Sequence, residues 1–380
     1  MRETAAKVLT VNAGSSSMRA HVVADGAVVD FFESEKPPDA EETLGGLRTL
    51  ISRVSTVDAV AHRIVHGGPD ITRPTRVDTR VRALLDNAAS LAPLHMPQAL
   101  ALLDFVSERL PAVPQVVCPD TAFHRDLPER ARAYALPESW RARWGLRRYG
   151  FHGISYGWAL GRACELLDRP ARELNLLIAH LSGGSSACAV SRGRSVDTTM
   201  GFTPLEGLMM SKRSGSVDPG LLLWLLREHK LTLEELETGL QRESGLLGLS
   251  GTSGDTRDLV RAAHQGDVRA SFALATFQHR AAREIAAVAA SLPSVDALVF
   301  TGDIGWDQPE VTEAIATGLG VLGIRGGLDS RRDADAVISE PGAAVPVLAI
   351  RSREELQLAS LAEFDLGRAG NTRPWTVARA

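Results

Sequence analysis

The chain has 380 residues, with 46 Asp and Glu against 42 Lys and Arg, and 44% of its residues are hydrophobic. The sequence pI is about 6.2 and the mean hydropathy is −0.03. This composition excludes a disordered, fibrous or membrane class, and the slightly acidic balance argues against a nucleic-acid or membrane-surface partner. The length predicts about two domains.

The three cysteines, Cys118, Cys164 and Cys188, lie far apart in the sequence and lack partners at metal-ligand spacing. They are predicted to be small buried thiols in a reducing compartment. The first segment, MRETAAKVLTVNAG, contains no apolar run long enough for a signal-peptide core. No stretch of about 18 apolar residues occurs, so a soluble, cytoplasmic protein is expected.

The N-terminal segment predicts three strands around a polar loop. The apolar run Val8–Val11 ends in the loop 12–17, and a second strand is expected over Met18–Val23. Asp25-Gly26 is typical of a hairpin turn before a third strand, Val28–Phe32. The glycine and hydroxyl groups of such a loop can wrap phosphate oxygens, although a single loop of this kind is more often a plain hairpin.

The same pattern returns in the second half of the chain. The apolar run Leu176–Ala179 leads into the loop 180–186, which precedes the predicted strand Ala187–Val190 and a turn at Arg192-Gly193. Two matched copies predict two similar domains and favour phosphate binding over plain hairpins.

Helical segments alternate with the predicted strands in the rest of the chain. Over residues 272–292, apolar side chains fall on one helical stripe. The stripe consists of Phe277, Ala281, Ile285, Val288 and Leu292. The pattern predicts a mixed α/β protein whose default site is the cleft between its halves.

A set of short motifs runs through most of the chain in a fixed order. They are VLTVNAGSSS (8–17), AHRIVHGG (61–68), LAPLH (91–95), PDTAFH (119–124), RRYGFHGISY (147–156), SVDTTMGFTPLEGLMM (195–210), RSGSVDPG (213–220), SGLLGLSGTSGDTRDL (244–259) and EEL (354–356). Together they resemble the acetate kinase family, part of the superfamily of acetate and sugar kinases, Hsp70 and actin.

The resemblance implies two duplicated RNase H-like (actin-like ATPase) domains with the active site in the cleft between them. Residues 1–120 and 356–380 are expected in the first domain, with the C-terminal helix returning to it. Residues 121–355 are expected in the second, which would carry the nucleotide side and the dimer contacts. The implied activity is transfer of the ATP γ-phosphoryl group to a short-chain carboxylate, with Mg²⁺ or alternatively Mn²⁺, by a homodimer.

Four residues match the family's catalytic positions: Arg63, Asp120, His152 and Arg213. In-line phosphoryl transfer needs fixed positive charge around the transferred group, and the planar guanidinium can bond two oxygens at once. The resemblance assigns Arg63 and Arg213 to the carboxylate and phosphoryl group, and His152 to the phosphoryl group in the transition state. The alternatives are surface ion pairs for the arginines, a helix N-cap for Asp120 and a structural role for His152.

Asn12 and Glu354 match the family's metal-linked positions, and carboxylate oxygens suit Mg²⁺. The segment 352–355 reads as a capping box between Ser352 and Glu355, which would leave Glu354 as the free carboxylate.

The resemblance also implies a small apolar pocket for the acyl group, made by Val65, Leu94, Phe151 and Pro204, with His95 near the substrate. Acetate or propionate would fit, but one methylene changes binding in such a pocket by only about 1–3 kcal/mol. Met96, Ile154 and Tyr156 depart from the family pattern and either change the substrate size or repack.

Nucleotide and phosphate contacts are implied for two glycine loops and for two later segments. The implied residues are Asn12, Ser15, Ser17, Arg19, His180, Gly183, Gly184, Asp255, Arg257, Gly302 and Gly305. Arg19 stands where the family has Lys, which keeps the charge but not the compact ammonium group. His180 and His95 have structural alternatives, and Asp255 alternatively starts a helix.

Departures from the family pattern gather on the nucleotide side. The family's GGIGEN is Gly302-Asp303-Ile304-Gly305-Trp306-Asp307 here, and its HLGNG is 180–184, with Ser182 and Gly184. Asp303 adds negative charge near an anionic ligand. Trp306 either fills the base pocket, which would favour pyrophosphate or another donor, or it stacks on adenine or packs outside the site.

The resulting function is an acetate kinase-like phosphotransferase that makes an acyl phosphate from a short-chain carboxylate and ATP. One alternative is the same chemistry with pyrophosphate or another donor. A second is a catalytically weakened ligand-binding or regulatory homologue, against which stands the complete set of charged residues. A sugar kinase or Hsp70-like ATPase would leave the acyl-site motifs unexplained.

Overall fold

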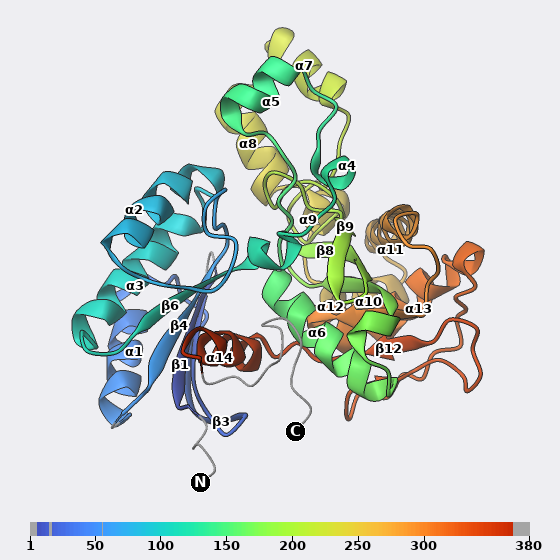
Figure 1. The fold of residues 1–380 in the computed structure, drawn as a ribbon. Helices are drawn as coiled ribbons and strands as arrows, with labels where there is room; N and C mark the ends of the chain where they lie inside the picture. The colour runs from blue at the N-terminus through green and yellow to red at the C-terminus, as the bar shows by residue number, and fades with distance from the viewer. Residues whose placement is uncertain (1–5, 15–16, 55, 368–380) are drawn as a thin grey trace. The chain divides into compact units, whose positions relative to one another are not determined.

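The computed structural model describes residues 6–14, 17–54 and 56–367. These residues form two compact units, and many of their elements are labelled in Figure 1. Among the described residues, the first unit takes those up to Arg125, Phe151–Gly161 and those from Arg353 on, and the second takes Asp126–Gly150 and Arg162–Ser352. Residues 151–161 group with the first unit rather than the second, because Gly153 lies directly against the backbone carbonyl of Asp120.

The first unit is built on a six-stranded sheet with the order β3-β2-β1-β4-β6-β5. The strands are β1 (Val8–Ala13), β2 (Met18–Ala24), β3 (Ala27–Ser34), β4 (Ala59–Ile64), β5 (Thr75–Arg76) and β6 (Gln115–Pro119). Its helices are α1 (Glu41–Arg53), α2 (Thr79–Ala88), η1 (Ala89–Leu91), α3 (Met96–Arg109), η2 (Asp120–His124) and α14 (Glu354–Asp365). Helix α6 (Gly153–Leu166) begins in this unit and ends in the second.

The side chains of β1 alternate between the two faces of this sheet. Leu9, Val11 and Ala13 pack into a hydrophobic cluster with residues of α1 and α3. Asn12 points to the opposite face, where its side chain bonds Glu354 at the start of α14. Helix α14 lies beside β1 in Figure 1, and it contacts β1, β4, β2 and β6. The C-terminal helix therefore returns to the first sheet.

The second unit has its own six-stranded sheet, with the order β11-β12-β10-β7-β8-β9. The strands are β7 (Asn175–Leu181), β8 (Ser185–Ser191), β9 (Arg194–Thr198), β10 (Ala297–Thr301), β11 (Ala336–Val337) and β12 (Val347–Ala349). The helices are α4 (Glu129–Arg132), α5 (Glu138–Trp144), η3 (Ala171–Glu173), α7 (Pro219–Arg227), α8 (Leu233–Arg242), α9 (Gly245–Ser250), α10 (Thr256–His264), α11 (Val268–Ala289), α12 (Gly302–Asp307), α13 (Pro309–Thr317) and η4 (Gly320–Leu322).

The two sheets have the same topology. In each, three strands in sequence form an antiparallel meander, β1-β2-β3 and β7-β8-β9. The first strand of each meander then pairs in parallel with β4 or β10, which in turn pairs in parallel with β6 or β12. A short antiparallel strand, β5 or β11, closes the edge. This correspondence confirms the duplicated α/β fold predicted from the repeated strand and loop pattern.

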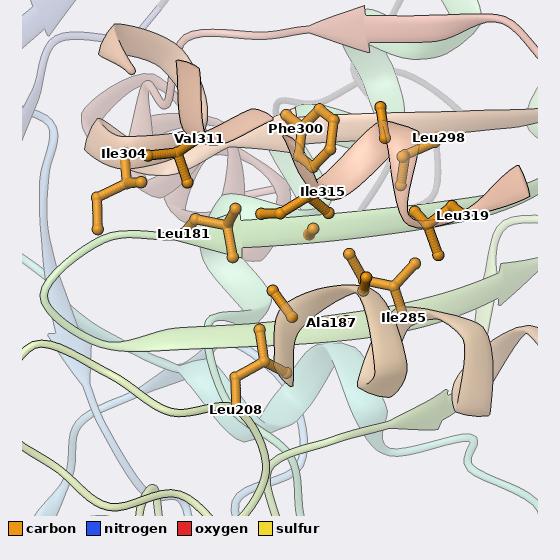
Figure 2. Packing of buried hydrophobic residues seen from close by; sticks show 14 of the residues in the cluster. Leu181, Ala187, Leu208, Ile285, Leu298, Phe300, Ile304, Val311, Ile315 and Leu319 are labelled. Carbon is orange, nitrogen blue, oxygen red and sulfur yellow. The ribbon is translucent and has the colours of Figure 1, made fainter. Parts of the chain in front are cut away.

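The core of the second unit lies between its sheet and the helices α11 and α13. Figure 2 shows Leu181, Leu298 and Phe300 of the strands facing Ile285 of α11 and Ile315 of α13. The predicted stripe is confirmed over Phe277, Ala281, Ile285 and Val288, which are buried in α11, whereas Leu292 lies beyond the helix and packs against the cluster.

Other local predictions are also confirmed. The turn at Asp25 and Gly26 has φ angles of 51° and 72°, as the hairpin requires. Cys118 and Cys188 are buried free thiols and Cys164 is partly buried. Burial raises the pKa of Cys188 to about 12, which keeps this thiol protonated. Among the described helices, none is long and apolar enough to cross a membrane.

Candidate functional site

Four of the predicted residues meet in the first unit, although they come from four different parts of the chain. Asn12 lies in β1, Arg63 in β4, Asp120 just after β6 and Glu354 at the start of α14. We call this set the carboxylate–arginine network. Strand β4 pairs in parallel with β1 on one side and with β6 on the other. The carboxyl ends of all three strands therefore reach the same edge of the sheet.

The network is held by direct hydrogen bonds. Arg63 donates to Asp120 through Nη2 at 2.6 Å and through Nε at 3.1 and 3.2 Å, which is a two-pronged ion pair. Its Nη1 donates to Asn12 Oδ1 at 3.1 Å. Asn12 Nδ2 in turn donates to Glu354 Oε2 at 2.8 Å, across 342 positions of sequence. The amide of Asn12 therefore links the arginine to the second carboxylate.

Burial and charge act against each other in this network. The Arg63 side chain is 16% exposed and that of Asp120 is 1% exposed. Burial lowers the pKa of Arg63, but the carboxylates of Asp120 and Glu354 outweigh it and raise that pKa above its ordinary value. Burial is also the largest influence on the pKa of Asp120 and raises it, while Arg63 opposes the shift. The arginine is therefore permanently charged.

His152 lies beside this network in an unusual backbone conformation. Its φ is 58°, in the left-handed region, and its backbone N–H bonds the Asp120 carboxylate. The next residue must be glycine, since a Cβ on Gly153 would lie 2.1 Å from the Asp120 carbonyl oxygen. Such strain is typical of functional sites. The structure thus places His152 next to Asp120, and its role toward a phosphoryl group stays a prediction.

The predicted acyl-site residues divide between the two units. Val65 and Phe151 are buried in the first unit, and the Phe151 ring lies edge-on to His66 with centroids 5.5 Å apart. Leu94 and His95 precede α3 and are partly exposed. Pro204 belongs to the second unit, so the assembly of one apolar pocket from these residues stays a prediction.

The departures near the acyl site are core residues. Met96, Ile154 and Tyr156 are fully buried. The Tyr156 ring packs against Phe123 and His124, with centroids 5.9 and 5.7 Å apart. These three side chains therefore repack the interior of the first unit.

The first phosphate loop is described in part. Ser15 lies outside the described residues, and Ser17 closes the turn by accepting a backbone hydrogen bond from Gly14 at 2.8 Å. Arg19 is paired with Asn12 in the β1–β2 register, which places both residues on one face of the sheet. Its guanidinium is half-exposed and lies 3.9 Å from Glu33.

The second phosphate loop joins β7 and β8 over residues 182–184. His180 is buried in β7, and the carbonyl of Gly183 accepts a hydrogen bond from the Ser211 amide at 3.3 Å. Ser182 Oγ donates to Asp303 Oδ2 at 3.1 Å. Gly302 has φ 81°, and a Cβ there would lie 2.6 Å from the Leu181 carbonyl oxygen. The loop and α12 are therefore packed together, which requires glycine at 302.

A pocket of about 520 Å³ opens in the second unit. Predicted residues Gly183, Asp255 and Arg257 line it, together with Asp303, which the sequence marked as a departure. We call it the second-unit pocket. Most of its lining is polar: Ser182, Ser211, Lys212, Thr252, Ser253, Thr256, Asp307 and Gln308 also face it.

Asp255 has both of the roles weighed from the sequence. It is the N-cap of α10, where its side chain accepts the Arg257 amide at 2.8 Å. It also holds the Arg257 guanidinium at 2.8 to 3.2 Å while lining the pocket. Arg257 is thus fixed locally as a flat, charged group at the pocket wall.

Trp306 does not fill the base pocket. Its side chain is 8% exposed and belongs to the hydrophobic cluster of the second unit, and it is absent from the pocket lining. The interpretation as a pocket-filling ring is wrong, because α12 turns this indole toward the core while Asp303 and Asp307 remain exposed. Packing outside the site is the alternative that the structure bears out.

The predicted capping box at the start of α14 is also wrong. The N-cap is Arg353, without a side-chain cap hydrogen bond, and Glu354 is the first helical residue. Glu355 instead accepts from Arg353 Nη1 at 3.4 Å. Glu354 is engaged by Asn12, so the carboxylate assigned to the metal is the one that faces the network.

Sequence reasoning missed several pocket residues. Lys212, Thr252, Asp307 and Gln308 line the second-unit pocket, and of these only Asp307 stood in a segment noted as a departure. Their common signal is position: they lie in the segments 211–213, 250–254 and 302–308, where glycine and serine are frequent.

The sequence is similar to that of known acetate kinases along most of its length. The Acetokinase family model matches residues 41–360. The acetate kinase of Deinococcus radiodurans is 45% identical over 87% of this chain and 83% of its own length, and that of Leifsonia xyli subsp. xyli is 41% identical over 93% and 97%.

Solved structures give the same relationship. The crystal structure of Porphyromonas gingivalis acetate kinase has a TM-score of 0.86 and 32% identity, covering 95% of this chain and all of that one. A propionate kinase from Francisella tularensis has a TM-score of 0.84 and 29% identity, covering 94% and 98%.

Proposed function

The chain belongs to the acetokinase family, and from this premise we propose how its own residues carry out phosphoryl transfer. It is a phosphotransferase whose acceptor is a carboxyl group: it forms an acyl phosphate from a short-chain carboxylate and ATP. One oxygen of the carboxylate bonds the γ-phosphorus while the bond from that phosphorus to the β–γ bridging oxygen breaks.

The carboxylate–arginine network is the observation that carries the assignment of roles. Arg63 supplies a charge that does not titrate, and both oxygens of Asp120 fix its orientation. A guanidinium held in this way neutralises charge on a carboxylate or a transferred phosphoryl group without reorganising. Arg213 would supply the second positive charge and His152 a hydrogen bond to the phosphoryl oxygens.

The donors around Asn12 fit a magnesium ion. Asp120, Glu354 and Asn12 Oδ1 bring two carboxyl groups and one amide oxygen together beside a single arginine. Mg²⁺ uses one or two carboxylates and keeps water or phosphate oxygens for the rest. Among the described residues, no group of three His, Cys, Asp or Glu side chains gathers as a full protein cage.

We propose that Glu354 and Asn12 hold this Mg²⁺, with Asp120 behind them. When bound, the ion would supply positive charge that offsets the charge of the phosphates. The residues of the chain do the remaining work: Asn12 keeps Glu354 aligned through its amide, and Arg63 opposes the rise that burial causes in the pKa of Asp120.

The donor nucleotide is assigned to the second-unit pocket. In this assignment the phosphates lie near Gly183. Asp255 holds the Arg257 guanidinium, whose flat face can stack on the nucleoside. For the acceptor, we propose acetate or propionate, because Val65 and Phe151 are buried apolar groups near the network's edge of the first unit.

We also propose that the protein is a homodimer. Helices α5 and α7 of the second unit carry large apolar side chains that are about half exposed: Trp140, Trp144, Leu221, Leu223 and Trp224. Such exposure is typical of protein interfaces. Sedimentation of wild type and of the double variant Trp140→Glu, Leu223→Glu tests this, and an unchanged monomer-sized species for both would refute it.

One assay tests the proposed function. Acyl phosphate is trapped as the hydroxamate with acetate, propionate and butyrate, each crossed against ATP, GTP and pyrophosphate, with and without Mg²⁺. Magnesium-dependent product with ATP and the two shorter acids is expected. Product with pyrophosphate alone would refute the donor, and equal rates with EDTA would refute the metal assignment.

A further inference from the structure

A second network of charged and aromatic side chains lies in the second unit, away from the residues discussed so far. Glu206 stands in the long connection between β9 and α7. Its Oε2 accepts the hydroxyl of Tyr134 at 2.5 Å, and its Oε1 accepts Arg148 Nη2 at 2.7 Å. Both oxygens of one carboxylate are therefore engaged by residues more than fifty positions away in sequence.

Tyr134 and Arg148 are themselves held side by side. Ala133 and Arg147 form an isolated antiparallel bridge, and the Arg148 amide donates to the Arg132 carbonyl at 2.7 Å. The two arms of this bridge enclose α5 in the sequence. Because the backbone fixes both partners, the carboxylate of Glu206 meets a preformed pair of donors.

Tyr134 and Arg148 also form hydrogen bonds with the backbone that precedes Glu206. Arg148 Nη1 donates to the carbonyls of Thr199 and Met200 at 3.0 Å each. The Tyr134 hydroxyl accepts the Phe202 amide at 2.8 Å. A Cβ at Gly201 would lie 1.7 Å from Glu206 Oε2, so a larger residue at this position would displace the carboxylate. The two supports of Glu206 thus also hold the backbone of this segment at residues 199, 200 and 202.

This segment holds the guanidinium of Arg213. Arg213 Nη1 donates to the Pro204 carbonyl at 3.0 Å, and Pro204 lies two positions before Glu206. Gly207 and Ser216, which lie on either side of Arg213 in the sequence, are also hydrogen-bonded to each other. Ser216 Oγ accepts the Gly207 amide at 3.0 Å, and the Ser216 amide donates to the Gly207 carbonyl at 2.9 Å. A displacement of Pro204 therefore moves the group that orients Arg213.

We propose that Glu206 is a positioning residue for Arg213, acting through the Pro204 carbonyl, with Tyr134 and Arg148 as its supports. The proposal rests on the catalytic role proposed for Arg213. Burial and the neighbouring Glu206 carboxylate raise the pKa of Tyr134, so the hydroxyl remains a donor throughout the neutral range. The support consequently does not vary with pH near neutrality.

Glu206→Gln keeps the size of the side chain but removes the charge that pairs with Arg148. The expected result is a kcat for acyl-phosphate formation that falls roughly 10- to 100-fold, since misplacing a catalytic group by about 1 Å has such effects. The KM for ATP should stay within about twofold, because the second-unit pocket is unchanged. Glu237→Gln, at an exposed glutamate that pairs with Gln241, is the matched control and should leave kcat unchanged.

The decisive measurement is a double-mutant cycle with Arg213→Ala. If Glu206 acts through Arg213, adding Glu206→Gln to Arg213→Ala lowers kcat no further, although each change alone lowers it. Losses that multiply would overturn the proposal by giving Glu206 an independent or purely structural effect. Thermal unfolding of all four proteins separates a change in stability from a change in kcat.

Two outcomes keep this proposal distinct from the function on which it rests. Wild-type activity in Arg213→Ala would refute the role of Arg213 and the proposal with it. An inactive Arg213→Ala beside a fully active Glu206→Gln would refute the proposal alone. If Glu206→Gln does not fold, Tyr134→Phe removes a single oxygen from the same network and replaces it in the cycle, with the same two outcomes.

Discussion

The carboxylate–arginine network and the second-unit pocket hold their charges in opposite ways. Asp120 is 1% exposed and pairs with a residue 57 positions away, whereas Asp255 is 38% exposed and pairs with Arg257 two positions on. Removal of one partner from a buried ion pair strongly destabilises a protein, whereas an exposed ion pair is screened by solvent and contributes little to stability. The network is therefore set by the whole fold, and the pocket wall by local sequence.

The largest effect is expected from breaking the network. Arg63→Ala should lower kcat by about 10³-fold or more, as for other arginines that stabilise a transferred phosphoryl group. It also leaves the buried Asp120 carboxylate without its main partner. Steady-state kinetics measure the loss, and Arg48→Ala, at a half-exposed arginine with only a 3.8 Å ion pair, is the control. Activity within a few-fold of wild type would remove Arg63 from the mechanism.

Trp306→Ala tests the core beneath the pocket. Removing this buried ring should lower the free energy of unfolding by about 3 kcal/mol or more, because a cavity is left in the second-unit cluster. Urea unfolding gives this value. The rejected interpretation makes the reverse prediction: an indole in the base pocket would change the KM for ATP at unaltered stability.

His62, which precedes Arg63 in β4, is predicted to make the stability of the buried first unit depend on pH. Burial lowers the pKa of His62 to about 4, and its Nε2 lies 2.7 Å from Gln115 Oε1. In the unfolded state His62 is protonated as the pH falls below about 6.5, whereas in the folded state it is protonated only near pH 4. Stability therefore falls as pH decreases through this window, by at most about 3 kcal/mol. His62→Gln should flatten that part of the unfolding curve, and identical slopes in both proteins would contradict the assignment.

Asp303→Asn should have the smallest effect. This exposed carboxylate faces the second-unit pocket, where it would repel an anionic donor bound as proposed. Its removal should lower the KM for ATP only a few-fold, by less than about 1 kcal/mol, and the gain should vanish at high salt. Asp307→Asn is the comparison at the same wall. A change of 100-fold would show that this side is as tightly specified as the network.

Much of this could be predicted from the sequence because the determinants are local. The strands around the two glycine loops follow from apolar runs and turn residues, and the duplicated sheets from their repetition. Arg63, Asp120 and Glu354 were found through motif resemblance, but the bond from Asn12 to Glu354 spans 342 positions and no local pattern contains it.

The failures also have physical causes. The position of Trp306 stayed open in the sequence because a six-residue helix can turn an indole to either side, and only the core of the second unit decides which. The capping box at Ser352 satisfied a sequence rule, yet α14 starts at Glu354, where the contact with Asn12 fixes its first turn. Tertiary contacts overrode local preference at both positions.

The return of α14 to the first sheet has a consequence for how the protein is made. On a ribosome, Asn12 is synthesised first and Glu354 follows 342 residues later. At 5 to 20 residues per second, that interval is roughly 20 to 70 seconds. During it the nascent chain holds Arg63 and Asp120 but not the second carboxylate, and its first sheet lacks the helix that covers one face. Translation that stalls before Glu354 therefore yields a chain without the glutamate proposed to hold Mg²⁺, so on this proposal catalytic competence arises only late in synthesis.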